Sequence, residues 1–211
     1  FTSTNSAFLS ESRGTSVTNP YFGQYKSSKG VVGKTHTRRY DLTFAQRLNW
    51  HQTYGKHDVE VMLGHEFYRN TNYYLSGSKS NMSSQANKEL AGAIEVQSTT
   101  SYLREYNTES WMGRAMYNYA DRYFAYGSVM RQASSAFHPD HRWGTFWSAS
   151  AGWMLSKESW FKAKWVDELK IKASYGENGN DQNMWYSYYY TNRYGISNSN
   201  GNIALTPSTT K

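Results

Sequence analysis

Between residues 143 and 155, tryptophan, alanine and leucine alternate with a set that is mostly serine and glycine. This period of two predicts a β-strand with two different faces. One face carries Trp147, Ala149, Ala151, Trp153 and Leu155, and the other carries Phe146, Ser148, Ser150 and Gly152. Two tryptophans at the ends of a face of small residues are typical of anchors at boundaries between polar and apolar surroundings. A soluble sandwich can also carry surface tryptophans, so the pattern alone fits a lipid-facing strand or a core-facing one.

The same period of two recurs along much of the chain. Residues 40–50 place five apolar residues on one parity, interrupted by Gln46. A turn at 54–57 leads into the alternating segment 58–68, and together they predict an antiparallel hairpin. Further strand is predicted at 69–77, 102–119, 123–132, 143–155 and 169–175, and an aromatic run at 185–190 with a turn at 198–202 predicts one more hairpin or an aromatic loop. The pattern therefore predicts seven or eight strands in up-and-down order.

The predicted connections alternate between short and long. Tight turns are expected at 54–57 and 120–122. Longer polar connections are expected at 1–30, the start of which could be the tail of a strand, and at 78–99 and 133–142. Residues 86–94 could hold a short helix, and Ser156 and Ser159 are candidate caps of a helical turn. Short turns on one side and long loops on the other are typical of outer-membrane barrels, and a soluble sandwich does not need that regularity.

The composition favours an all-β fold. The 211 residues include 19 Tyr, 8 Trp and 9 Phe, with only 3 Pro and no Cys, and aromatic residues combined with Asn, Ser, Thr and Gly favour strands and turns. A mean hydropathy of −0.82 and the lack of an apolar run of about 18 residues exclude a helical membrane protein. A membrane barrel stays compatible, because the polar faces of its strands line a wet interior. The lack of cysteine excludes disulfides, thiol catalysis and cysteine-based zinc sites.

The chain is basic, with a net charge of +7 and a pI near 9.4. The basic residues are scattered, and Arg38-Arg39 is the only arginine pair, so no nucleic-acid partner is predicted. Residues 1–6 have neither the basic start nor the apolar stretch of a signal peptide. Without an initial methionine, and without a closing element at 207–211, the chain reads as an internal piece of a longer protein.

No group of residues predicts catalysis. His65-Glu66 lacks the second histidine of a zinc-protease helix, and the sequence contains neither a phosphate-binding glycine loop nor a Gly-x-Ser-x-Gly elbow. His138, Asp140 and His141 could ligate a metal from one loop, but solvated loop residues are the simpler interpretation. We therefore predict no enzyme activity, no catalytic residue, no metal site and no cofactor.

Aromatic residues provide the candidate sites. Those assigned to outer loops could stack on sugar rings, and these candidate substrate contacts are Tyr73, Tyr74, Trp185, Tyr186, Tyr188, Tyr189 and Tyr190. The candidate membrane-interface aromatics are Trp50, Tyr54, Tyr117, Tyr119, Trp147 and Trp153. The alternative for both groups is that abundant aromatic residues pack among themselves.

Three segments resemble, in the same order, the barrel signature of the SusC/RagA family of TonB-dependent outer-membrane transporters. They are residues 114–123 (RAMYNYADRY), 137–153 (FHPDHRWGTFWSASAGW) and 169–180 (LKIKASYGENGN). Residues 57–66 are similar to the hairpin that precedes this signature in the family, whereas residues 131–135 depart from the family's pattern.

The resemblance implies a 22-stranded, plugged, antiparallel transmembrane barrel in the cell outer membrane, with short periplasmic turns and long extracellular loops. Residues 1–211 would be part of that barrel domain, without the plug domain and without the segment that contacts the TonB complex. The family imports large nutrients, as glycan oligosaccharides or peptides, with a SusD-like surface lipoprotein as partner and outer-membrane lipid around the barrel.

Two other classes of protein stay open on the sequence alone. A soluble or surface-attached β-rich carbohydrate-binding module is the alternative function, and such a module would be monomeric without detergent. An outer-membrane enzyme is the third class, and it requires a convergent acid/base or nucleophile set that the sequence does not show.

Overall fold

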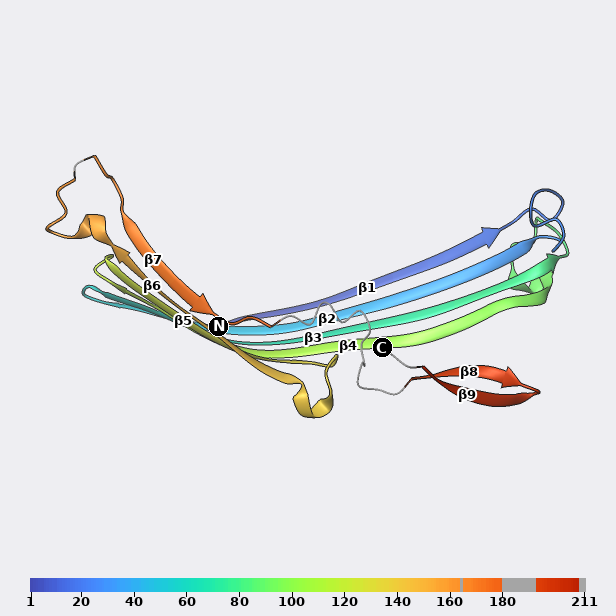
Figure 1. Cartoon of the computed structure of the whole chain (residues 1–211). Coiled ribbons are helices and arrows are strands. Elements are labelled where there is room, and N and C mark those ends of the chain that lie inside the picture. The colour runs from blue at the N-terminus through green and yellow to red at the C-terminus, as the bar shows by residue number, and fades with distance from the viewer. Residues whose placement is uncertain (164, 180–192, 209–211) are drawn as a thin grey trace. The chain divides into compact units, whose positions relative to one another are not determined.

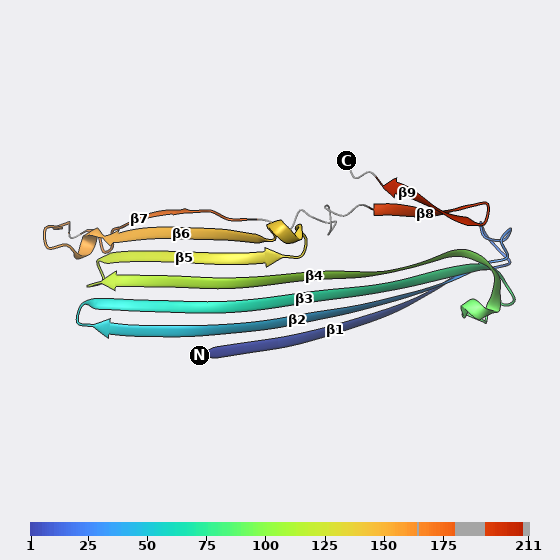
Figure 2. The ribbon, with the colours of Figure 1, turned by 90° about the horizontal axis from the view of Figure 1, so that it is seen from below.

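The chain folds into antiparallel β-sheets, which confirms the predicted all-β class. The computed structural model describes residues 1–163, 165–179 and 193–208. One sheet contains, in spatial order, β1 (Thr2–Val17), β2 (Val31–Tyr54), β3 (His57–Met82), β4 (Ala93–Tyr119), β5 (Tyr123–Ser134), β6 (Trp143–Met154) and β7 (Lys170–Gly176). Each strand lies beside its neighbour in sequence (Figures 1 and 2). The predicted up-and-down order is therefore confirmed.

A second sheet is the hairpin of β8 (Arg193–Ser199) and β9 (Asn202–Ser208), so the hairpin expected around the turn at 198–202 is present. Three 3-10 turns lie in the connections, η1 (Leu90–Gly92), η2 (Pro139–His141) and η3 (Leu155–Lys157). No helix among the described residues is long and apolar enough to cross a membrane.

Alternation of side chains makes these segments strands. Along β6, exposed and half-buried residues alternate from Trp143 to Met154, which is the period of two of a pleated strand. The register pairs Trp147 with Val129 of β5 and Ala149 with Tyr175 of β7. An aromatic residue meets a β-branched one in the first pair and a small one in the second, and such cross-strand pairs stabilise a sheet.

Short and long connections alternate as predicted, with one exception. β2 and β3 are joined by a tight turn at Gly55-Lys56, and β4 and β5 by a tight turn in which Ala120 and Asp121 both have a φ of +54°. The opposite ends of the strands are joined through residues 18–30, 83–92 and 135–142. The exception is the connection between β6 and β7, residues 155–169, which is long although it leaves the sheet on the side of the tight turns.

Two of the predicted polar connections contain more strand than expected. Residues 2–17 form β1, and the polar segment 78–99 is mostly strand, because β3 continues to Met82 and β4 begins at Ala93. Val32, Met82 and Ala93 are buried together, and Val17 and Leu90 pack against them. Burial of this small apolar cluster stabilises the ends of β3 and β4, although the segments around it are polar on average.

Each of the two predicted helical segments contains a single 3-10 turn, and the predicted serine caps are wrong. The segment 86–94 contains only the single turn η1. The residue before η3 is Met154, which makes no side-chain capping hydrogen bond, so Ser156 and Ser159 do not begin a helix. The connection after β6 is therefore shaped by tertiary contacts of other residues, described below.

Contacts divide the chain into two compact units. The first unit contains residues 1–4, 44–67 and 106–211, and the second contains residues 5–43 and 68–105. In the second unit, Asp41 accepts hydrogen bonds from Asn70 and from the Tyr68 hydroxyl at 3.0 Å, and Arg39 Nε lies 2.8 Å from its carboxylate. The two faces of the sheet in the first unit carry the candidate site.

Candidate functional site

One face of the sheet in the first unit carries no charge over a wide band. Successive rows of this band, read across β4, β5, β6 and β7, are Tyr119, Tyr123, Trp153 and Ile171; Tyr117, Ala125, Ala151 and Ala173; Ala115, Gly127, Ala149 and Tyr175; and, across β4 to β6, Gly113, Val129 and Trp147. We call this the uncharged face. Trp147 and Trp153 are 44% and 37% exposed, so the single-layered sheet leaves large aromatic surface uncovered.

The opposite face of the same strands is polar, and we call it the charged face. Arg114 of β4 pairs with Glu60 of β3 at 3.0 Å, and Thr53 donates a hydrogen bond to Asp58 at 3.1 Å. Lys170 lies on this face with its Nζ 3.5 Å from the centre of the Phe124 ring, a cation–π contact. Over this band every charged residue of β4 to β7 lies on the charged face, so the two faces differ in polarity and are suited to different surroundings.

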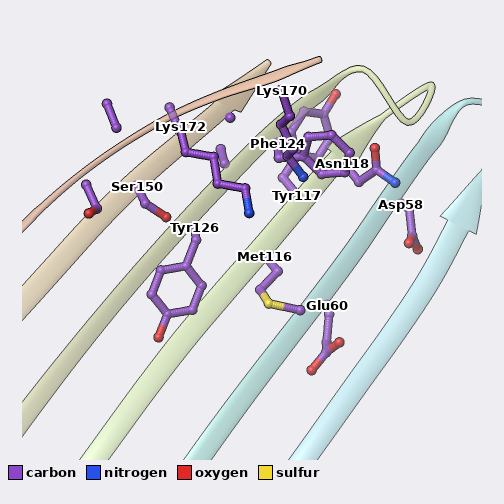
Figure 3. A pocket seen from close by; sticks show the side chains of 15 residues that line it. Asp58, Glu60, Met116, Tyr117, Asn118, Phe124, Tyr126, Ser150, Lys170 and Lys172 are labelled. Carbon is purple, nitrogen blue, oxygen red and sulfur yellow. The ribbon is translucent and has the colours of Figure 1, made fainter. Parts of the chain in front are cut away.

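A cavity of about 540 Å³ lies against the charged face near the tight turns. Its most prominent side chains come from β3 to β7 and lie on one side of the strands, as Figure 3 shows; they are Asp58, Glu60, Met116, Phe124, Tyr126, Ser150, Lys170 and Lys172. Acidic residues come from β3 and lysines from β7, with Met116, Phe124 and Tyr126 between them. The lining of the cavity is therefore apolar at its centre, acidic on the β3 side and basic on the β7 side.

The charges of this cavity are not all neutralised within the sheet. Glu60 is paired with Arg114, whereas Lys172 forms no ion pair among the residues that the structure describes. A lysine ammonium has three donors and no acceptor, so Lys172 is able to bind an acidic or carbonyl-rich partner. The alternation of Lys170 and Lys172 with Ile171 and Ala173 was the sequence signal for this surface, and the sequence reasoning assigned it no role.

Glu158 ties the long β6–β7 connection to aromatic side chains beside the tight turns. Its carboxylate accepts hydrogen bonds from the Tyr123 hydroxyl at 2.7 Å and from Trp153 Nε1 at 3.0 Å, and Arg122 lies 3.5 Å away. The Glu158 side chain is only 9% exposed. The bonds from Tyr123 and Trp153 lower the pKa of Glu158, because they stabilise its charged form. These contacts explain why this connection folds back on the sheet.

The tight turn between β4 and β5 is held by polar contacts of its own. Asn118 Nδ2 donates to Asp121 at 2.7 Å, and Lys157 Nζ lies 3.3 Å from the same carboxylate. Both contacts lower the pKa of Asp121, the hydrogen bond from Asn118 more than the charge of Lys157. The turn and the β6–β7 connection are therefore joined by Lys157 and Asp121 as well as by Glu158.

Two of the candidate substrate contacts, Tyr73 and Tyr74, lie on β3, within the strand predicted at 69–77, although they were also grouped with the outer-loop aromatics. Their contact with substrate stays a prediction. Tyr74 stacks on Tyr102 with ring centres 4.9 Å apart, so packing between aromatic residues accounts for its position. Trp185, Tyr186, Tyr188, Tyr189 and Tyr190 lie outside the described residues, and their role stays a prediction.

The candidate interface aromatics are strand residues. Tyr117, Tyr119, Trp147 and Trp153 lie on the uncharged face, and Trp50 and Tyr54 share one parity of β2. Near the tight turns the rings form a row, in which Tyr119 stacks on Tyr123 and Tyr123 stacks on Trp153, each at 6.3 Å. Tyr123, which crowds the same tight turn in the sequence, and Trp143 also lie on this face, and each is 44% exposed. Their contact with a membrane interface stays a prediction.

No group of three or more metal-ligating side chains is present among the described residues. His138 Nδ1 lies 3.4 Å from an Asp140 oxygen, and the His138 and His141 rings are 6.3 Å apart. Asp140 is 79% exposed, as expected for a solvated loop. The site is therefore a pair of contrasting surfaces with a cavity on one of them.

Comparison with known proteins links this arrangement to one kind of transporter. No family model matches the chain. The TonB-dependent receptor SusC of Bacteroides thetaiotaomicron is 25% identical over 186 residues, covering 87% of this chain and 18% of that protein. The TonB-dependent receptor P3 of Formosa agariphila is 27% identical over 136 residues, covering 63% and 14%. The chain thus spans less than a fifth of the length of these two relatives.

Solved structures share the fold over nearly the whole chain. The RagAB peptide transporter superposes with a TM-score of 0.88 at 20% identity, covering 99% of this chain and 24% of that chain. The chain is SusC/RagA-like. The 'open-open' state of the RagAB peptide importer superposes on the SusC-like chain with a TM-score of 0.85, at 20% identity and with 98% and 23% coverage.

These likenesses bear on three of the predictions. The predicted resemblance is confirmed, and the seven-stranded up-and-down sheet corresponds to part of the RagA barrel. The SusC-like chain also agrees with the prediction of a non-enzymatic protein, because its relatives are TonB-dependent receptors and transporters.

Proposed function

We propose that the chain forms part of the wall of a TonB-dependent importer in the outer membrane. The observation that carries the proposal is the separation of the uncharged face from the charged face on β4 to β7. In lipid, outward-facing residues of barrel strands are apolar and inward-facing residues are polar. The uncharged face then contacts lipid, and the charged face, with its cavity, lines the interior.

The dimensions of the uncharged face support this orientation. The stretch of β6 from Trp143 to Trp153 is about 33 Å long at ~3.3 Å per residue. Tilted by about 40°, it crosses roughly 25 Å, the height of the apolar band of an outer-membrane barrel. The two aromatic boundaries on β6 are then Trp153 and Trp143, which is 44% exposed. Trp147, the residue proposed from the sequence for the second boundary, falls within the band beside Tyr175.

The full transporter is proposed from the relatives. It is a 22-stranded barrel enclosing a plug domain, with tight turns in the periplasm and longer connections outside the cell. The cavity at Lys170 and Lys172 lies at the periplasmic end of this arrangement, on the interior wall. A SusD-like lipoprotein partner and energy from the TonB complex follow from the likeness to SusC and to the RagAB complex.

The proposed cargo is a large nutrient, either a glycan oligosaccharide or a peptide. The fold likeness to the RagAB peptide transporter supports a peptide, and the glycan class rests on the resemblance of the sequence to the SusC/RagA family. A carbohydrate-binding module is the second candidate function, and exposed rings such as Trp147 and Tyr175 would be its binding surface.

Solubility and uptake separate the two functions. The full-length protein is expected to need detergent or lipid to stay monodisperse, and deletion of its gene is expected to abolish uptake of labelled oligosaccharides or peptides. Collapse of the proton gradient is expected to stop the same uptake. A full-length protein that stays monomeric and folded in buffer without detergent would contradict the importer and support the module.

A further inference from the structure

Arg131 is the first charged residue of β5 on the uncharged face. From Tyr123 onward this face of β5 carries Ala125, Gly127 and Val129 before the arginine. The register places Trp111 of β4 and Thr145 of β6 beside Arg131. The distance along β5 from Tyr123 to Arg131 is about 26 Å at ~3.3 Å per residue. Arg131 therefore lies at the end of the uncharged band away from the tight turns.

No acidic residue neutralises Arg131 among the residues that the structure describes. Within the described part of the chain, the guanidinium group of Arg131 makes a cation–π contact with the Trp143 ring, whose centre is 5.4 Å from the guanidinium carbon. The exposed guanidinium retains five N–H donors in a planar fork, and this geometry matches two oxygens of a phosphate. The aromatic contact orients the fork without occupying its donors.

The nearest carboxylate on this face is held by other residues. Glu109 lies one row farther along β4, opposite Ala133. It accepts a hydrogen bond from Trp111 Nε1 at 3.2 Å and lies 3.3 Å from His65 Nε2. Arg131 and Trp143 thus form a positively charged, aromatic patch at the boundary, beside an acid that already has partners.

We infer that Arg131 and Trp143 bind the phosphate group of an outer-leaflet lipid headgroup. The inference rests on the proposed orientation, in which the longer connections lie outside the cell. Charge complementarity supports a phosphorylated lipid, because an unpaired arginine facing hydrocarbon is costly while one at headgroup level meets anionic oxygens. The apolar rows below Arg131 would contact the acyl chains of the same lipid, and the ring of Trp143 would lie at the headgroup boundary.

Native mass spectrometry of the full-length protein in detergent tests the inference with a phosphorylated lipid A and its dephosphorylated form, which has the same acyl chains. The wild-type protein is expected to bind the phosphorylated lipid roughly tenfold more tightly, as for one charge-assisted bidentate contact. Arg131→Gln is expected to lose this preference, and Arg131→Lys, which keeps the charge, to retain part of it. The matched control is Arg69→Gln, because Arg69 is already paired with Glu105 at 2.6 Å.

The outcomes separate this inference from the proposed function. Equal binding of the two lipids by the wild-type protein, an unchanged preference in Arg131→Gln, or an equal loss in Arg69→Gln each overturns the inference and leaves the importer standing. Inorganic phosphate that displaces the lipid completely at millimolar concentration also overturns it, because the site would then be a free-phosphate site. A full-length protein that is soluble without detergent refutes the importer itself.

Discussion

Replacement of Ala149 by arginine is expected to destabilise the full-length barrel by about 2–4 kcal/mol, the cost of an arginine on the lipid face near the bilayer midplane. Ala149 lies between Trp153 and Trp143 on β6, in the row that contains Gly127 and Tyr175. An arginine here has no carboxylate on its own face within that band. The free energy of unfolding, measured by denaturant titration of protein folded into lipid vesicles, gives the effect.

Ser150→Arg is the matched control, since it introduces the same side chain one residue away on the other face. Ser150 lines the cavity of about 540 Å³, which has room for the longer side chain, and Glu60 lines the same cavity. A change below about 1 kcal/mol is expected there, typical of an exposed substitution. Equal destabilisation by the two substitutions would mean that both faces meet the same medium, and the lipid-facing assignment would be wrong.

Gly30→Val is expected to have the second large effect, a loss of about 2–6 kcal/mol in the free energy of unfolding. Gly30 ends the connection between β1 and β2 with a φ of +77°, a region that costs a β-branched residue roughly 1–3 kcal/mol. A Cβ here would also lie 2.9 Å from both the Pro20 Cβ and the Thr18 carbonyl oxygen. Relief of that clash must move the backbone, at a further cost of about 1–3 kcal/mol.

Gly23→Val separates these two contributions in the same connection. Gly23 has a φ of +81°, but no atom lies within 4 Å of the position of a Cβ. Its substitution should therefore show the conformational cost alone, about 1–3 kcal/mol. Denaturant unfolding and limited proteolysis of residues 18–30 measure both variants. If Gly23→Val destabilises as much as Gly30→Val, the close packing against Pro20 has no energetic role.

The sequence predicted the strands where the two faces differ in polarity. On β6 the contrast between the Trp147 face and the Ser148 face repeats without interruption, and the observed strand ends within one residue of the predicted one. In β1 both faces consist mostly of Ser, Thr and charged residues. The two faces therefore do not differ in polarity, and the period of two is not visible even though threonine favours strands. The same lack of contrast concealed the outer ends of β3 and β4, where the buried cluster of Val32, Met82 and Ala93 depends on residues distant in sequence.

The candidate site was predictable as a pattern but not as a set of contacts. Parity alone placed Trp147 and Trp153 on one face of β6, and the structure agrees. The hydrogen bond from Tyr123 to Glu158 joins residues 35 positions apart, so no local sequence pattern predicts it. The stacking of Tyr74 on Tyr102 of the next strand is likewise a contact between residues distant in sequence, and the pattern of 69–77 did not indicate it.

Cysteine labelling of the full-length protein in intact cells tests the central claim most directly. The chain contains no cysteine, so within it each introduced thiol reports a single position. Asp140→Cys lies in the exposed turn η2 between β5 and β6, and Lys56→Cys lies in the exposed tight turn between β2 and β3. We predict that a membrane-impermeant maleimide labels position 140 in intact cells and labels position 56 only after the cells are broken. Labelling of position 56 but not of position 140 in intact cells would contradict the account.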